Sequence, residues 1–65
     1  MPGSRYAKTL EHATGVFGSR HLAEDWLQKP CKYLDNHVPL ELIDSSQGFQ
    51  VVEDYLTRIE HGVYQ

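Results

Sequence analysis

A chain of 65 residues holds at most one small domain, because a single hydrophobic core supplies comfortable stability unaided only from roughly 70 to 80 residues upward. Its 40% hydrophobic content, with one tryptophan, two phenylalanines and four tyrosines, excludes a disordered tail. A formal net charge of −3, with six scattered lysines and arginines, excludes the basic stripe that autonomous nucleic-acid binding requires. The sequence therefore describes a small folded domain that would gain stability from a partner.

The number of cysteines and the hydropathy of the chain indicate in which cellular compartment the protein is expected. Cys31 has no second cysteine with which to form an internal disulfide, and no apolar run approaches the ~20 residues of a membrane span or resembles a secretory signal. We expect a protein of the reducing cytoplasm, with no membrane role. Residues 1–4 offer little to bury and are expected to be a cloning remnant or a frayed end, so that the helical domain covers residues 5–65.

Two amphipathic helices are predicted in the first half of the chain. The first ends at about Gly15 or Gly18 and has apolar side chains spaced by four, three and four residues, at Tyr6, Leu10, Ala13 and Phe17. Ser19 is the expected N-cap of the second, which ends before Pro30. One face of this second helix carries Leu22, Ala23, Trp26 and Leu27.

Turn-forming residues follow, and then a short helix. Asp35 and Asn36 tolerate left-handed backbone, so residues 31–38 are predicted to form a loop, with Leu34 as its anchor to the core. Pro39 suits the first position of a third helix of about two turns, because its missing N–H would be unpaired there anyway. Buried contacts are expected from Leu40, Leu42 and Ile43.

The longest amphipathic run follows Ser45 or Ser46, either of which can cap a fourth helix. Its apolar stripe is spaced for a helix and not for a strand, at Val52, Tyr55, Leu56, Ile59 and Val63. Gly48 near the first turn is unfavourable by ~1 kcal/mol relative to alanine, which suggests a close backbone approach to another element. Gly62 is the expected C-terminal cap.

These elements predict an all-α fold, a small single domain of three to four short helices. Its predicted core is formed by Phe17, Leu22, Trp26, Leu27, Leu42, Val52, Leu56 and Ile59.

Neither a catalytic nor a metal site is predicted. The four histidines and Cys31 lack the short spacings that place two ligands on one metal, so solvated or capping histidines are expected. Cys31 has no supporting base in a recognisable arrangement. The carboxylates Glu24, Asp25, Glu53 and Asp54 occupy outward helical positions, where solvation is the default. We expect no cofactor, no metal and no enzymatic activity.

The combined pattern resembles the toxin-binding domain of antitoxins of the Xre/MbcA/ParS family over about residues 7 to 64. Single elements of it are common, but their order and spacing in so short a chain are specific. Asp35-Asn36 stands where the family tends to have a glycine pair, a change that preserves turn capacity. The resemblance is carried by Val16-Phe17-Gly18, Ala23-Glu24-Asp25-Trp26-Leu27, Pro30, Leu34, Pro39-Leu40-Glu41-Leu42-Ile43, Gly48 and Arg58-Ile59-Glu60-His61-Gly62-Val63-Tyr64.

The resemblance implies an α-helical antitoxin domain that binds and neutralises a RES-domain toxin, an enzyme acting on NAD, and is not itself the catalyst. In the family this domain usually follows a helix-turn-helix DNA-binding domain. None precedes Tyr6 in the sequence, so we expect either an excised domain or a protein that does not bind nucleic acid by itself.

The end of the fourth helix is the predicted partner-binding site, because little sequence remains there to bury it. Arg58 is expected to act as a polar anchor and Tyr64 as an aromatic inserted toward the toxin's active-site cleft. The full predicted set is Arg58, Ile59, His61, Gly62, Val63 and Tyr64. The alternative is a dimerisation or adaptor module of a DNA-binding regulator, in which the apolar stripe pairs with its own copy as a homo-oligomer.

Overall fold

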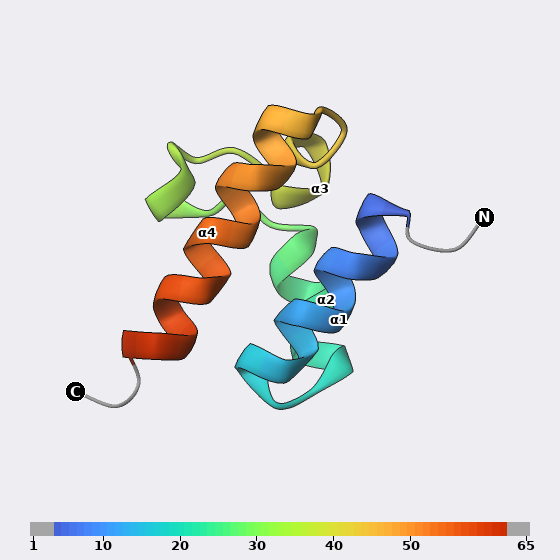
Figure 1. Ribbon diagram of the computed structural model, residues 1–65, viewed down its shortest axis with the longest axis vertical. Helices are drawn as coiled ribbons and strands as arrows, with labels where there is room; N and C mark the ends of the chain where they lie inside the picture. The colour runs from blue at the N-terminus through green and yellow to red at the C-terminus, as the bar shows by residue number, and fades with distance from the viewer. Residues whose placement is uncertain (1–3, 63–65) are drawn as a thin grey trace.

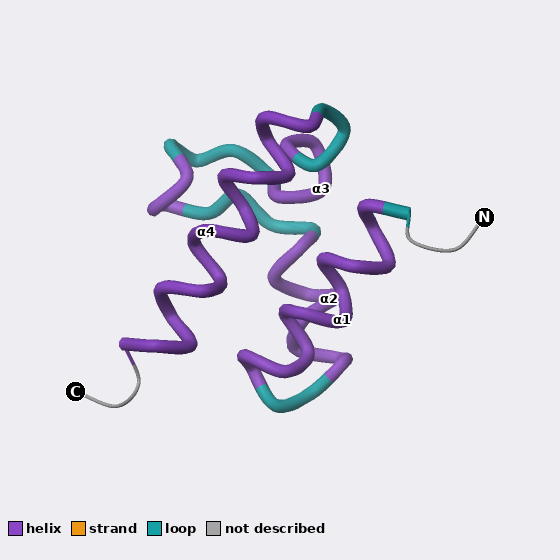
Figure 2. The backbone as a smooth tube through the Cα atoms, viewed as in Figure 1, coloured by secondary structure: helices purple, strands orange, loops and turns teal. Residues whose placement is uncertain are grey.

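The computed structural model describes residues 4–62, which fold into four α-helices and one 3-10 turn. The two long helices lie side by side in contact, with the second helix packed on the first and the short third helix on the start of the last (Figure 1). Helices joined by loops account for all of the described residues (Figure 2), which confirms the predicted all-α fold. The elements are α1 (Arg5–Phe17), α2 (Arg20–Leu27), η1 (Lys32–Leu34), α3 (Pro39–Leu42) and α4 (Ser46–Gly62).

Serine caps start three of the four helices. The Ser19 hydroxyl accepts the Leu22 N–H at 3.4 Å, as predicted. The Ser45 hydroxyl accepts the Gly48 N–H at 3.0 Å, so Ser45 and not Ser46 caps α4. Ser4, grouped above with the end of the chain, has a structural role, since its hydroxyl accepts from Ala7 at 3.1 Å and caps α1.

The first helix ends at Gly18, where φ is +83°, a left-handed conformation that glycine adopts without steric cost. Gly15, the other predicted end, lies inside α1. Gly62, the expected C-terminal cap, is the last described residue of α4, and Gly18 is the only glycine with positive φ among residues 4–62.

A closely hydrogen-bonded turn connects α2 to α3. The Cys31 N–H donates to the His37 carbonyl at 3.0 Å, and the Asn36 N–H donates to the Cys31 carbonyl at 2.9 Å. Between these bonds Asp35 and Asn36 adopt φ of +57° and +63°. The predicted loop is therefore correct, but it contains the 3-10 turn η1, and both predicted turn formers are left-handed.

Two contacts hold α3 in place. An added Cβ at Gly48 would overlap the Leu42 carbonyl, which confirms the predicted close backbone approach between α4 and α3. The Arg5 guanidinium donates from Nε to the Ile43 carbonyl at 2.7 Å and from Nη2 to the Asp44 carbonyl at 2.8 Å. The start of α1 thus satisfies carbonyl groups that the end of α3 leaves unpaired.

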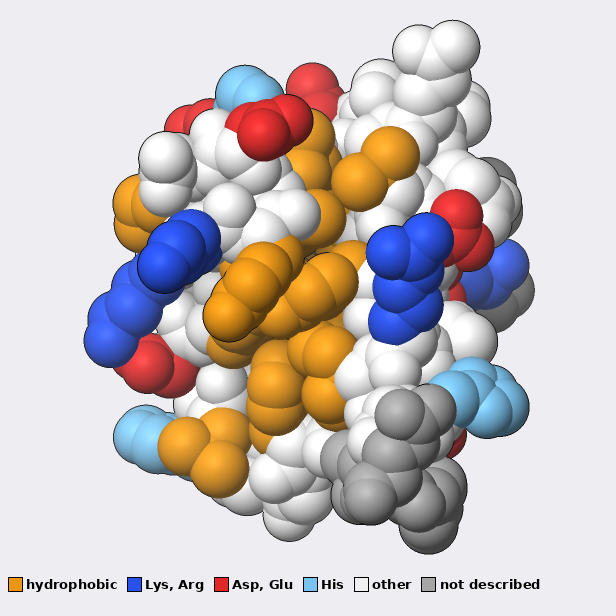
Figure 3. All heavy atoms as spheres, turned by 90° about the vertical axis from the view of Figure 1, so that its left-hand side faces the viewer, with side chains coloured by type: hydrophobic (Ala, Val, Ile, Leu, Met, Phe, Trp, Pro, Cys, Tyr) orange, Lys and Arg blue, Asp and Glu red, His pale blue; other side chains and the backbone are white. Residues whose placement is uncertain are grey.

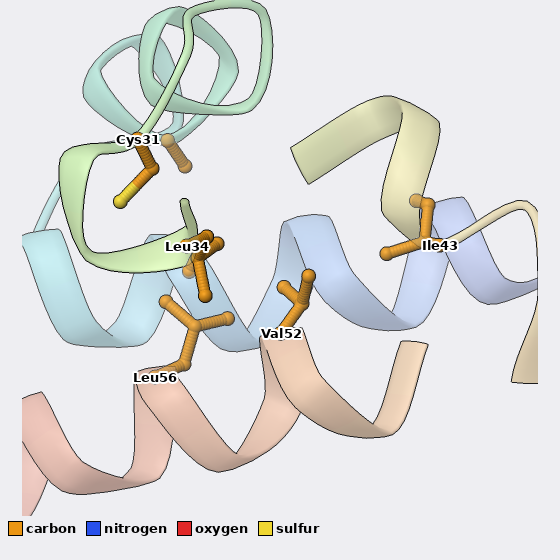
Figure 4. Close-up of a cluster of buried hydrophobic side chains, with 7 residues drawn as sticks. Cys31, Leu34, Ile43, Val52 and Leu56 are labelled. Atoms are coloured by element: carbon orange, nitrogen blue, oxygen red, sulfur yellow. The ribbon is translucent and has the colours of Figure 1, made fainter. Parts of the chain in front are cut away.

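The core lies between α1, α2 and α4 and is closed by the loop and α3. In Figure 4, Leu34 from η1 and Leu56 from α4 point toward one another, while Val52 points inward one turn earlier. Pro39 and Thr9 are also fully buried. The buried hydrophobic side chains are Ala13, Ala23, Leu27, Cys31, Leu34, Ile43, Val52 and Leu56.

The predicted core is correct for Leu27, Val52 and Leu56, and wrong for Leu22, whose exposed fraction is 54%. In α2 the face that carries Ala23 packs on α1. Leu22 is the preceding residue, so its side chain lies about 100° away around the helix and faces outward. Four other predicted members are half-buried at the margin of the core: Phe17, Trp26, Leu42 and Ile59. The small residues Ala13 and Ala23, by contrast, are fully buried.

Candidate partner-binding site

The last turn of α4 presents the predicted partner-binding residues together. Arg58, His61 and Gly62 are exposed, and Ile59 is half-buried against the fold. Val63 and Tyr64 lie outside the described residues. Within residues 4–62 no ion pair involves Arg58. The guanidinium of Arg58 is therefore available to a carboxylate of another molecule.

A histidine clamp fixes α4 against α1. His12 Nδ1 lies 2.8 Å from Glu53 Oε1, and His12 Nε2 lies 3.4 Å from Glu60 Oε1. The side chains of His12 and Glu53 are 22% and 24% exposed, so the prediction that they are solvated is wrong for both. Both ring nitrogens donate only when the imidazole is protonated. The clamp restrains the C-terminal half of α4, so the helix end is presented on a fixed frame.

Aromatic side chains form a ladder from the core margin to the surface. The ring centroids of Phe17 and Trp26 are 5.5 Å apart, and those of Trp26 and Tyr55 are 5.9 Å apart at an interplanar angle of 11°. The Tyr33 ring stacks on Tyr55 at 6.0 Å. Centroid separations in this range are favourable for aromatic pairs. The ladder links α1, α2 and α4 to the turn η1.

The outer end of the ladder lines a groove of about 240 Å³ between η1 and α4. Hydrophobic side chains gather over this face in a continuous band with Lys and Arg side chains on either side (Figure 3). Tyr33 is 75% exposed and Val51 is 48% exposed, while Leu34 is buried beneath them. We call this feature the aromatic groove, and its residues are Tyr33, Leu34, Val51, Asp54, Tyr55 and Arg58.

The Tyr55 phenol remains neutral well into the alkaline range. Burial raises the pKa of Tyr55 above its ordinary value, and the nearby Cys31 thiol and Tyr33 phenol raise it further. Tyr55 is thus a hydrogen-bond donor and apolar surface at neutral pH, with no charge to interfere with stacking.

Sequence patterns predict only part of the aromatic groove. Arg58 belongs to the predicted helix-end site, whereas Tyr33 and Val51 belong to no predicted site. Tyr33 lies in a loop, where periodicity gives no signal, and Val51 lies beside the predicted apolar stripe of α4. One local feature could have indicated Tyr33: it directly precedes the anchor Leu34 and the turn formers Asp35 and Asn36. A short turn that buries one side chain exposes the neighbouring one.

Within residues 4–62 no group of three or more His, Cys, Asp or Glu side chains is placed to hold a metal ion. No described helix is both long enough and apolar enough to cross a membrane. The described surface instead offers exposed aromatic, aliphatic and arginine side chains on a rigid helical frame, the groups that are enriched at protein interfaces. These features define a small all-helical protein-binding domain.

Comparison with known proteins identifies the family. The model of the antitoxin Xre/MbcA/ParS C-terminal toxin-binding domain matches residues 12–62, and the chain belongs to this family. The match contains the histidine clamp, the turn and the described part of α4.

Two curated relatives are similar over nearly the whole chain. An antitoxin Xre of Photorhabdus laumondii is 30% identical over 61 residues, covering 92% of this chain and 41% of the relative. An antitoxin Xre of Yersinia enterocolitica is 31% identical over 62 residues, covering 94% of this chain and 42% of the relative. The chain thus spans about four tenths of the length of these curated relatives. No solved structure gives a significant match.

Proposed function

We propose that this chain binds a RES-domain toxin and neutralises it by placing the C-terminal end of α4 over the toxin's NAD-binding active site. The observation that carries the proposal is the family match over residues 12–62, which includes the last turns of α4. In this role the chain is a binding protein and not a catalyst, and it needs no cofactor.

The chemistry of the helix end suits such a contact. Arg58 is exposed and can form a bidentate pair with a carboxylate or a phosphate of the partner. His61 adds a second polar group one turn of helix later. In the proposal Tyr64 is the inserted aromatic and Val63 supports it, while Ile59 joins the contact to the core. The histidine clamp favours affinity, because a restrained helix loses less entropy on binding.

Truncation tests the proposal. A chain ending at Ile59 lacks residues 60–65, and with them the longer clamp contact to Glu60 at 3.4 Å. It keeps Val52, Leu56 and the shorter clamp contact between His12 and Glu53 at 2.8 Å. We expect this variant to fold and to lose protection of NAD when it is co-expressed with the toxin. A chain ending at Tyr64, which lacks only Gln65, is the matched control and should protect fully.

The assay is NAD content of cells that express toxin with each antitoxin form, together with co-purification through a tag on the toxin. Full protection by the chain ending at Ile59 would overturn the role given to the helix end. A chain that self-associates beside an active toxin, without forming a complex, would favour a dimerisation module instead.

A further inference from the structure

We infer that the aromatic groove is a further docking site for the toxin, adjoining the end of α4 through Arg58, and that it takes an apolar side chain flanked by a carboxylate. The inference rests on the proposed function and names a part of the interface that the helix end does not supply. It is carried by four features of the groove: a closed turn, a supported exposed ring, the volume of the groove, and an arginine that forms no ion pair within residues 4–62.

The turn that displays Tyr33 has a fixed geometry. The Cys31 N–H donates to the His37 carbonyl at 3.0 Å, and the Asn36 N–H donates to the Cys31 carbonyl at 2.9 Å. Between these bonds Asp35 and Asn36 have φ near +60°, a left-handed region that these two residue types tolerate better than other residues with a side chain. Leu34 anchors the turn in the core, whereas Tyr33 is 75% exposed. The turn therefore holds the Tyr33 side chain outward.

The Tyr33 ring is exposed but supported. It stacks on Tyr55 at 6.0 Å, and Tyr55 stacks in turn on Trp26 at 5.9 Å. Because Trp26 reaches the margin of the core, the ladder restrains a ring whose outer part remains in water. A pre-positioned tyrosine contributes a large contact area at low entropic cost, which is why tyrosine is enriched among binding hot spots.

The groove's dimensions and charge indicate the occupant. A volume of about 240 Å³ is below the ~300 Å³ at which pockets for small ligands begin, so the groove fits a protruding side chain. Tyr33 and Val51 provide apolar walls. The Asp54 carboxylate already accepts from the Gln50 amide at 3.2 Å, while no ion pair within residues 4–62 involves Arg58. The complementary group is an apolar side chain beside a carboxylate.

The toxin fits this description better than a second copy of the chain. Even a small stable interface takes roughly 600 Å² from each partner, which a groove of six residues cannot supply alone. Arg58 belongs both to the groove and to the predicted binding end of α4, so the groove extends a contact that the helix end begins. A partner held at the helix end therefore needs little further area from the groove.

Two groove substitutions with matched controls test the inference. Tyr33→Ala removes the displayed ring, and Tyr6→Ala removes a 44%-exposed tyrosine of α1 that lies outside the groove. Val51→Lys places a charge in the groove, and Leu22→Lys makes the same change at a 54%-exposed aliphatic position of α2. The measurement is the affinity of each purified 65-residue chain for the purified toxin by calorimetry, with a thermal melt and the oligomeric state of each variant.

We expect Tyr33→Ala and Val51→Lys to weaken binding at least about tenfold, and the two controls to change it less than about twofold. Groove variants that bind like the unaltered chain would overturn the inference while leaving the proposed function intact. Variants that change only self-association would overturn it in favour of a second copy. If the unaltered chain binds no toxin, the proposed function itself is overturned. This result is distinguished from failure of the inference because it concerns the unaltered chain and not a groove variant.

Discussion

Single residues decide how closely the helices approach. Gly48 lies in the first turn of α4, where its α-carbon faces the Leu42 carbonyl with no room for a side chain. Gly15 lies in the last turn of α1 with nothing within 4 Å of an added Cβ. The two glycines therefore have opposite roles, since only Gly48 is required by packing.

The Gly48→Ala variant is expected to lower the free energy of unfolding by about 2 kcal/mol, because the obstacle is backbone and α3 or α4 must shift. The matched Gly15→Ala variant should raise it by about 0.5–1 kcal/mol through helix propensity. Urea denaturation followed by helical circular dichroism measures both. Equal gains in the two variants would contradict the close contact.

At the scale of elements, the turn between α2 and α3 sets the position of the aromatic groove. Its backbone bonds between Cys31 and both Asn36 and His37 close the turn, and Leu34 packs it on Leu56. The orientation of Tyr33 follows from this closure and not from burial of its own ring. A substitution that changes the backbone of the turn should therefore also change the stacking of Tyr33 on Tyr55.

Asn36→Val tests the turn, because a β-branched side chain is disfavoured at φ of +63°. We expect a loss of about 1–2 kcal/mol of stability, whereas Asn36→Gly should be neutral or slightly stabilising. Denaturation monitored by Trp26 fluorescence is the suitable measurement, since Trp26 stacks on Tyr55 within the ladder. A tolerated valine with unchanged fluorescence would show that the left-handed backbone is not needed.

At the scale of the whole molecule, the domain is small and part of its core is built from short side chains. Its Cα radius of gyration is 11.1 Å, and three of its buried hydrophobic residues are Ala13, Ala23 and Cys31. A chain of this size buries only about 60% of the surface that its unfolded form exposes, a smaller share than in larger domains, so its stability margin is narrow. Binding a partner should then stabilise it measurably.

If the toxin binds the folded chain, toxin at about 100 times the dissociation constant should add about 2.7 kcal/mol to the free energy of unfolding. We expect the backbone amides of Val52 and Leu56, both buried in α4, to exchange with solvent only when the whole domain unfolds. Their exchange should therefore slow about 100-fold. Mass spectrometry of peptides from this chain would measure the change in the mixture. The chain ending at Ile59 provides the comparison, and equal slowing in both chains would argue against a contact at the helix end.

Local rules predicted much of the fold. The caps at Ser19 and Ser45, the left-handed pair and the first position of α3 at Pro39 depend on the chemistry of a few adjacent residues. Burial of Leu22 was predicted wrongly, because an eight-residue helix has several possible apolar faces and only its neighbours select one. The same limit explains why the predicted core residues Phe17 and Trp26 are only half-buried, while Ala13 and Ala23 are fully buried.

Helix periodicity, capping and motif order are local properties, so the residues alone predict the helical class, the order of the elements, the resemblance to a toxin-binding domain and the helix end as a candidate site. Helix packing, by contrast, sets the contacts of His12 with Glu53 and Glu60 and the stacking of Tyr33 on Tyr55 beside Arg58. These partners lie 22 to 48 positions apart in the chain. No local rule specifies pairs at such separations, since they depend on how the helices pack.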